Sequence, residues 1–201
     1  AAAGLAGLIK GNASGDFIAT VAGKTEVQTK LALSELVAEP KLTIETLPTI
    51  TAEIRADIAA DGKITFNAPL LFSRDGRKSD LALSGTLATG PAGLAVDARV
   101  ASTLLVVEDV QILAAPFAGG SPAPSTAATP APGRDAKPAW ACISGQVALS
   151  LKKVVYAQKF EVADVGGAIR IDAGALKLDG VRAGFSDGSE FKLNGGVTFR
   201  E

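Results

Sequence analysis

Residues 52–60 read AEIRADIAA, and this stretch decides the fold of the chain. Ile54 and Ile58 alternate along it with charged residues such as Glu53 and Arg55. A period of two is typical of a β-strand that turns one face to an apolar environment and the other to water. The stretch therefore predicts one strand of a sheet with a single apolar face.

The segments that follow continue this alternation across turns that contain glycine. A loop at residues 61–63 and further turns at 73–80 and 88–93 keep the apolar side chains of four strands on one face. A slip of one residue would move a whole strand's apolar side chains to the polar face, so the agreement predicts an antiparallel meander. The expected cross-strand pairs are Ile58 with Phe66, Ile54 with Leu70, Phe72 with Leu81, and Leu87 with Leu94.

Both ends of the chain repeat the pattern. Residues 17–21 can fold onto residues 27–31, and residues 42–44 can extend that pair. Near the C-terminus the expected pairs are Ile171 with Leu176, Ile169 with Leu178, Ala183 with Leu193, and Phe185 with Phe191. We therefore expect an all-β fold, an antiparallel meander sheet curled into an open groove or half-barrel. At most one or two short helices are expected, at residues 104–113 and residues 1–9.

Residues 114–139 form the one clear boundary in the chain, because they hold six of its ten prolines. Such a segment buries too little apolar area to offset the entropy cost of ordering it. We expect a first β segment at 1–113, a disordered Pro/Ala-rich insertion at 114–139, and a second β segment at 140–201 that continues the same sheet. The alternative is two separate domains. The absence of methionine leads us to expect a piece of a longer protein.

Few side chains in this sequence are suited to catalysis or metal binding. There is no histidine, and Cys142 is the only cysteine, which excludes a His-dependent triad, imidazole ligands, an internal disulfide and a Cys-x-x-Cys pair. We expect Cys142 to lie in a strand that enters the core. Most acidic residues fall at turns or on the polar face, where turn formation and solvation explain them. We expect no enzyme activity, no cofactor and no metal ion.

The charge balance does not point to a nucleic-acid partner. The net charge is −1, with 20 basic and 21 acidic residues interspersed along the chain. The apolar run at residues 1–9 is too short to cross a bilayer.

The apolar face of the predicted sheet needs a cover, because soluble monomers rarely expose more than a few hundred Å² of contiguous apolar surface. A second sheet or a packed helix is the usual cover. The best helical candidate, residues 104–113, is short. Two alternatives stay open: a trough that suits acyl chains, and a closed, dry sandwich.

The second β segment resembles a known family. The stretches that carry the resemblance are WACISGQVALSLKKVVY (140–156), FEVADVGGAIRI (160–171), ALKLD (175–179) and FSDGSEFKLNGG (185–196). They are similar to the C-terminal segment of AsmA-like proteins, in which a Pro/Ala-rich insertion also precedes this segment. Residues 15–113 resemble the family only in style, and the resemblance does not extend to the family's membrane-anchoring helix or N-terminal region.

The resemblance implies a periplasmic protein tethered to the inner membrane, related to AsmA and TamB. Its β-groove would conduct phospholipids toward the outer membrane and support outer-membrane assembly, with membrane contact through parts of the parent protein that are missing here. The alternative is a structural or adhesive β-sandwich module with no lipid role. The residues expected to line a surface for phospholipid acyl chains are Ile54, Ile58, Phe66, Leu70, Leu83, Leu87, Ile169, Ile171, Leu176, Leu178, Phe185 and Phe191.

Overall fold

The described part of the chain forms one open, single-layer β-sheet with one helix. The computed structural model describes residues 9–22, 24–38, 47–90, 93–118, 142–172, 174–185 and 187–198. Its elements are β1 (Ile9–Ala22), β2 (Lys24–Ala38), β3 (Thr49–Ile58), β4 (Ile64–Arg74), β5 (Arg77–Gly90), β6 (Gly93–Ser102), β7 (Leu105–Val106), α1 (Val107–Ala118), β8 (Ile143–Tyr156), β9 (Phe160–Asp172), β10 (Ala175–Phe185) and β11 (Glu190–Thr198).

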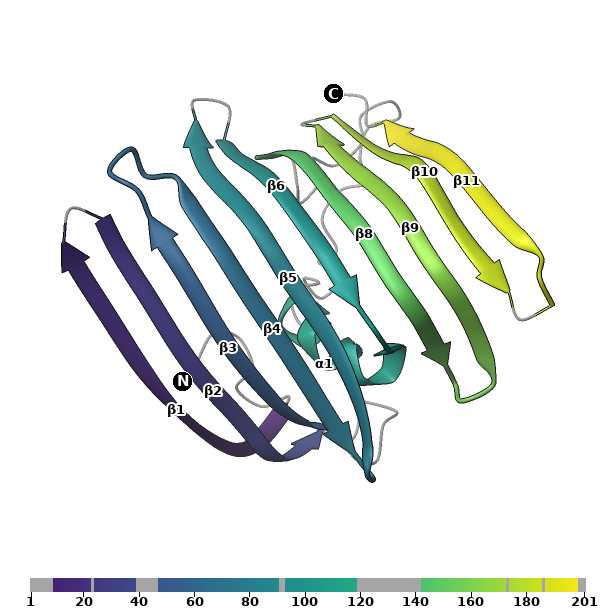
Figure 1. Cartoon of the computed structure of the whole chain (residues 1–201), viewed down its shortest axis with the longest axis horizontal. Helices are drawn as coiled ribbons and strands as arrows, with labels where there is room; N and C mark the ends of the chain where they lie inside the picture. The colour runs from purple at the N-terminus through teal and green to yellow at the C-terminus, as the bar shows by residue number, and fades with distance from the viewer. Residues whose placement is uncertain are drawn as a thin grey trace, which may run out of the picture.

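The strands follow one another across the sheet almost in chain order (Figure 1). The order is β1-β2-β3-β4-β5-β6-β8-β9-β10-β11, and β7 pairs with β8 beside this path. Neighbouring strands are antiparallel except that β8 runs parallel to β6 and β7. Strands from before and after the Pro/Ala-rich insertion therefore belong to one sheet. The structure confirms the expected all-β fold with an open, mostly antiparallel sheet.

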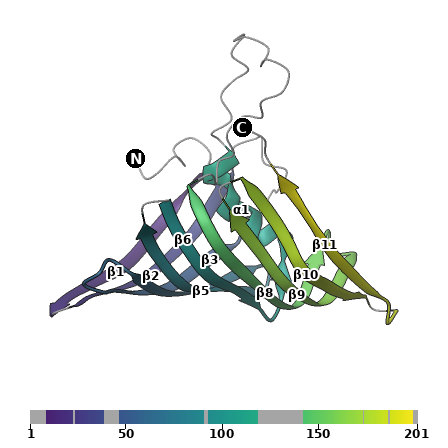
Figure 2. The ribbon, with the colours of Figure 1, turned by 90° about the horizontal axis from the view of Figure 1, so that it is seen from above.

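The sheet is curved, and α1 lies on its concave side (Figure 2). The helix belongs to the connection that leads from β6 through β7 to β8, which runs parallel to β6. A parallel neighbour requires a crossover connection, and a helix is the usual element in such a connection. The sequence pattern did not predict this crossover.

The predicted strand faces are right, but most of the predicted registers are wrong by two residues. The structure pairs Ile58 with Ile64, Ala52 with Leu70, Leu70 with Leu81, and Leu87 with Val96. At the N-terminal end, residues 17–21 pair with residues 25–29 instead of 27–31. A shift of two leaves each side chain on its predicted face, because the side-chain period of a strand is two.

The turns explain these shifts. The Ala59 amide donates to the Lys63 carbonyl at 2.9 Å, and Gly62 adopts a φ of 81°, so the first loop is residues 60–62. Asp75 and Gly76 both have positive φ, 52° and 78°, which makes a tight two-residue turn between Arg74 and Arg77. Each loop is therefore placed differently from the one expected.

The C-terminal hairpins give one confirmed register and one correction. Ile171 pairs with Leu176 and Ile169 with Leu178, as predicted. Ala183 pairs with Phe191 instead of Leu193. The register between β10 and β11 shifts after Leu178, where Gly180 has a φ of 58°, and an irregularity of this kind cannot be read from alternation alone.

The helix is close to its expected position but extends further. It covers Val107–Ala118, so the first five residues assigned to the insertion are helical. Residues 119–141, residues 42–44 and most of the N-terminal helix candidate lie outside the described residues, and Ile9 begins β1. No helix in the described ranges is long and apolar enough to cross a membrane.

The buried core is small and lies under α1. Ile50 and Phe72 are 4% and 0% exposed and pack together at its centre. The partly buried side chains around them come from β2, β4, β5, α1 and the segment just before β3: Leu33, Leu36, Leu47, Leu70, Leu81, Val110 and Leu113. The helix thus covers the ends of a few strands and not the whole sheet.

Cys142 corrects a sequence expectation. Its side chain is exposed, at the turn residue before β8, instead of packed in a core strand. Its carbonyl accepts a hydrogen bond from the Leu94 amide at 2.8 Å, so the backbone joins the sheet while the thiol faces solvent.

Candidate functional site

The concave side of the sheet carries a continuous apolar surface. The strand register aligns a row of apolar side chains across the sheet from β3 to β10: Ile58, Ile64, Leu87, Val96, Ile171 and Leu176. Further rows lie closer to α1, and the core residues Ile50 and Phe72 share their face. We call this surface the concave apolar face.

All twelve residues predicted to line such a surface lie on this face. Ten of them, all except Phe185 and Phe191, lie on strands β3 to β10 at positions that the register places on this face. Each of the ten is partly exposed. Phe185 pairs with Val162 and meets the ring of Phe160 edge to face, at 6.1 Å between ring centroids. Phe191 lies on β11 and is 47% exposed. The twelve form a broad surface and not a compact pocket.

Exposure rises along this surface from α1 toward both edges of the sheet. Under the helix, Phe72 is 0% exposed, whereas Phe17 and Val21 on β1 are 67% and 78% exposed. On β11, Val197 is 55% exposed. No second sheet faces the concave side among the residues that the structure describes. A large apolar surface therefore stays open to solvent.

The first turn of α1 is fixed by a buried carboxylate. Asp109 is 0% exposed, and its Oδ1 lies 3.0 Å from Nη2 of Arg74 at the end of β4. The Ser79 hydroxyl donates a hydrogen bond to Asp109 Oδ2 at 2.7 Å, and Arg77 lies 3.9 Å from Oδ1. A buried charge is tolerated when it is paired and hydrogen-bonded, so this cluster sets where the helix docks.

Two more carboxylates hold the crossover at the same end of the sheet. The Ala157 amide, in the turn between β8 and β9, donates to Glu108 Oε1. The amides of Thr103 and Leu104 donate to Asp80 at 2.9 to 3.1 Å. The start of α1 is therefore bound to both halves of the sheet.

Sequence reasoning missed this polar cluster. The signal was present, because Glu108 and Asp109 interrupt an otherwise apolar segment. Acidic residues in the first turn of a helix also complement the helix dipole. Arg74 and Ser79, the partners of Asp109, are recognisable only once the tight turn at Asp75 is placed, since that turn brings the ends of β4 and β5 together.

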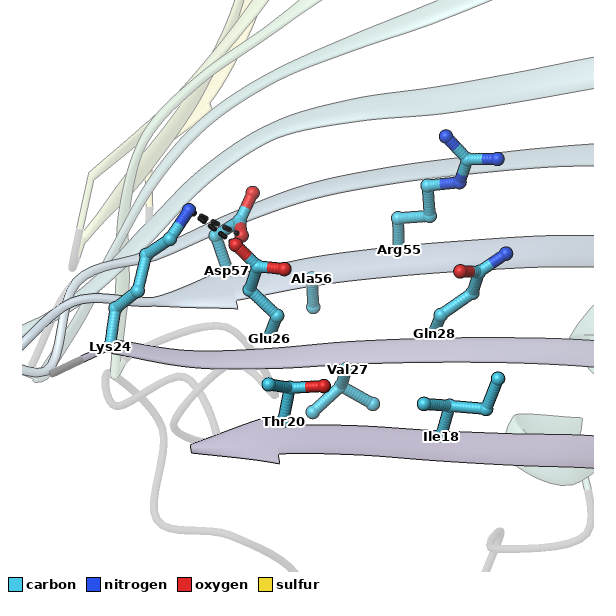
Figure 3. Close-up of a pocket in the computed structure, with 9 residues that line it drawn as sticks. All are labelled: Ile18, Thr20, Lys24, Glu26, Val27, Gln28, Arg55, Ala56 and Asp57. Carbon is cyan, nitrogen blue, oxygen red and sulfur yellow. Dashed lines mark hydrogen bonds and ion pairs between the residues drawn. The ribbon is translucent and has the colours of Figure 1, made fainter. Parts of the chain in front are cut away.

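The convex side of the sheet is more polar than the concave side, although Ile18 and Leu71 are exposed on it. Figure 3 shows a shallow hollow lined by side chains of β1, β2 and β3, most of them charged or polar, together with apolar ones such as Ile18. Lys24 lies 2.6 Å from Glu26 and 3.5 Å from Asp57, and the hydrogen bond to Glu26 raises the pKa of Lys24. These groups are solvent-exposed, and ion pairs of this kind add little stability.

A metal centre is absent from the described residues. No group of three His, Cys, Asp or Glu side chains is placed to hold a metal ion there. The buried Asp109 is already engaged by arginine and serine. The main feature of the described geometry is an extended apolar surface that is partly exposed to solvent.

The fold defines a class of protein: an open, curved, single-layer β-sheet with a helix docked over part of its apolar face. No known protein family, characterised protein or solved structure matches this chain in the comparisons made.

Proposed function

We propose that the concave apolar face binds the acyl chains of phospholipids, and that the chain is part of an envelope protein that conducts lipid between membranes. One observation carries the proposal. The apolar side chains that a closed sandwich would bury between two sheets are here left partly exposed on a single sheet, with α1 over only part of them.

Elementary energetics favour an acyl chain as the occupant. Shielding each methylene from water contributes about 0.8 kcal/mol, so eight shielded methylenes contribute roughly 6 kcal/mol. The surface is lined by Ile, Leu, Val and Phe and contains few polar groups. It therefore offers a lipid tail many weak and similar contacts, which permit it to slide, and no bond is made or broken.

The polar convex face supports the same proposal. A sheet with ion pairs on one side and an open apolar surface on the other can stay in water while it holds lipid tails. The edges support it as well, because Phe17 and Phe191 leave the apolar surface uncovered at both ends of the strand order. The surface is therefore open from edge to edge.

The resemblance of residues 140–201 to AsmA-like proteins gives the proposal its setting. In that setting the parent protein is periplasmic and tethered to the inner membrane. Its lipid cargo would move toward the outer membrane and support outer-membrane assembly.

The test compares two matched pairs of substitutions. Ile58→Asp with Leu87→Asp places two carboxylates on the concave apolar face, away from α1. Ile18→Asp with Leu71→Asp makes the same exchange on the convex side, where these residues are 60% and 57% exposed. Each protein is incubated with vesicles of phosphatidylethanolamine and phosphatidylglycerol, reisolated, and analysed by native mass spectrometry and lipid extraction.

We expect the unchanged protein and the convex pair to retain phospholipid and the concave pair to lose at least nine tenths of it. Circular dichroism and the thermal midpoint check that all three are folded. Phospholipid absent from the unchanged protein, or lost equally from both pairs, would overturn the proposal. A folded, lipid-free chain would instead favour the structural or adhesive module.

A further inference from the structure

The strand β1 forms one edge of the sheet and is poorly protected against pairing with another strand. It spans 14 residues, and within the described part of the chain it pairs only with β2. An edge strand presents a row of unpaired N–H and C=O groups along its free side, and these groups can pair with the edge of another sheet. Natural edges are usually guarded by charges, proline, bulges or short length.

These guards are nearly absent from residues 12–22. This stretch reads NASGDFIATVA, with Asp16 as its single charge and no proline. The irregularity in its pairing with β2 is confined to the start, between Lys10 and Asn12. Both faces of the strand expose apolar groups: Phe17 and Val21 on the concave side, and Ile18, 60% exposed, on the convex side.

The opposite edge is shorter than β1 and carries more charge than residues 12–22. The strand β11 has nine residues, begins with Glu190 and Lys192 in an exposed ion pair at 3.2 Å, and continues with Gly195 and Gly196. Charges discourage edge pairing, and glycine weakens a strand. An added strand is therefore favoured at β1 over β11.

We infer that two copies of this chain pair through β1, antiparallel, about a two-fold axis perpendicular to the sheet. A two-fold contact is self-complementary by construction. It also keeps both concave faces on the same side, so that Phe17 and Val21 meet the same apolar face of the partner. Asp16 is the single charged residue of the stretch 12–22. It therefore faces an uncharged residue of the partner's stretch in every register except the one that places the two Asp16 side chains opposite each other.

The size of the contact points to a weak, concentration-dependent dimer. Residues 12–22 extend over roughly 36 Å at about 3.3 Å per residue, enough for a continuous ladder of backbone hydrogen bonds. Pairing along one strand edge buries on the order of 1,000 Å² in total, at the lower limit of stable protein interfaces. We expect dissociation in the micromolar range. The inference concerns an edge and not the lipid-binding face, so it stands apart from the proposed function.

The first experiment uses two valines at matched places. Val21 on β1 and Val197 on β11 are both exposed, and both lie on the concave side near the end of the sheet away from α1. Sedimentation velocity of lipid-free protein over a hundredfold concentration range should show a monomer–dimer equilibrium. We expect Val21→Lys to weaken it at least tenfold and Val197→Lys to leave it within twofold of the unchanged chain.

The second experiment locates the contact directly. In a Cys142→Ser background, a nitroxide label is attached to cysteine at position 20 or 198 through Thr20→Cys or Thr198→Cys, two exposed positions on opposite edges. Short distances between labels are expected from position 20 and not from position 198. A monomer at every concentration, equal effects of the two lysine variants in folded protein, or short distances only from position 198 would each overturn the inference.

Discussion

Replacing Asp109 by alanine should release the first turn of α1 from the sheet. The carboxylate is 0% exposed. It forms an ion pair with Arg74, whose side chain is 11% exposed, and accepts a hydrogen bond from the hydroxyl of Ser79. Without it, the buried guanidinium loses the charge of this carboxylate and the hydroxyl loses this acceptor. Arg77 contributes little to the effect, because it is 32% exposed and 3.9 Å away.

The expected size follows from this burial. Removing one partner of a buried ion pair typically costs about 3–5 kcal/mol. We expect the lower end, about 3 kcal/mol, because solvent can reach Arg74 once the helix moves. The apolar contacts of Val110 and Leu113 are the main remaining contribution to docking at this point. The helix should therefore separate before the sheet unfolds, and Phe72 should become exposed.

Amide hydrogen exchange and the fluorescence of a hydrophobic dye measure this release. In Asp109→Ala, exchange in α1 should accelerate by about a hundredfold for 3 kcal/mol at 1.4 kcal/mol per factor of ten, and dye binding should increase. Gln111→Ala, an exposed change on the same helix, is the matched control. An effect of Asp109→Ala below about 1 kcal/mol, with no added dye binding, would refute the anchoring role and leave apolar packing as the main cause of docking.

Three further results are expected. Phe72→Ala removes the fully buried ring under α1 and should lower the free energy of unfolding by about 3–5 kcal/mol in urea titration. Gly145→Ala should cost at least about 2 kcal/mol, because its φ is 125° and a Cβ would overlap the backbone of β6, whereas Gly188→Ala, with a φ of 84° and open space, should cost about half as much. The Arg55 guanidinium, through its hydrogen bond and charge, lowers the pKa of the Glu53 carboxyl. The small stabilisation from this pair is therefore present above the ordinary carboxyl pKa and is lost on acidification below about pH 4. Arg55→Gln should reduce this acid dependence of the unfolding free energy, and an unchanged pH profile would contradict the assignment.

Alternation along the strands predicts the faces of this sheet but not its registers. Ile58, Phe66 and Leu87 lie on the expected face, although none of them has the expected partner. Period-two patterns determine the face of a residue and leave shifts of two undetermined. Turn chemistry resolves the ambiguity, and the tight turn at Asp75 and Gly76 is the kind of Asp-Gly signal that could have been used.

The helix and its anchor were less accessible to sequence reasoning. Residues 104–113 were the best helical candidate, but the parallel crossover that carries α1 over the concave side depends on contacts between distant segments. The pairing of Asp109 with Arg74 spans 35 positions and becomes visible only in three dimensions. The candidate surface itself followed from the alternating pattern, since all twelve of its predicted residues share one side of the sheet.

The single layer of strands also determines how the chain should come apart. Each strand contacts mainly the two beside it, as in a linear array of repeats, so stability is close to a sum over neighbouring pairs. Such an array frays from its ends, and β1 and β11 should open and close while the strands under α1 remain intact. Unfolding should then proceed in steps from the edge strands inward and not as a single two-state transition. The outer strands are the ones that can open and pair with another chain.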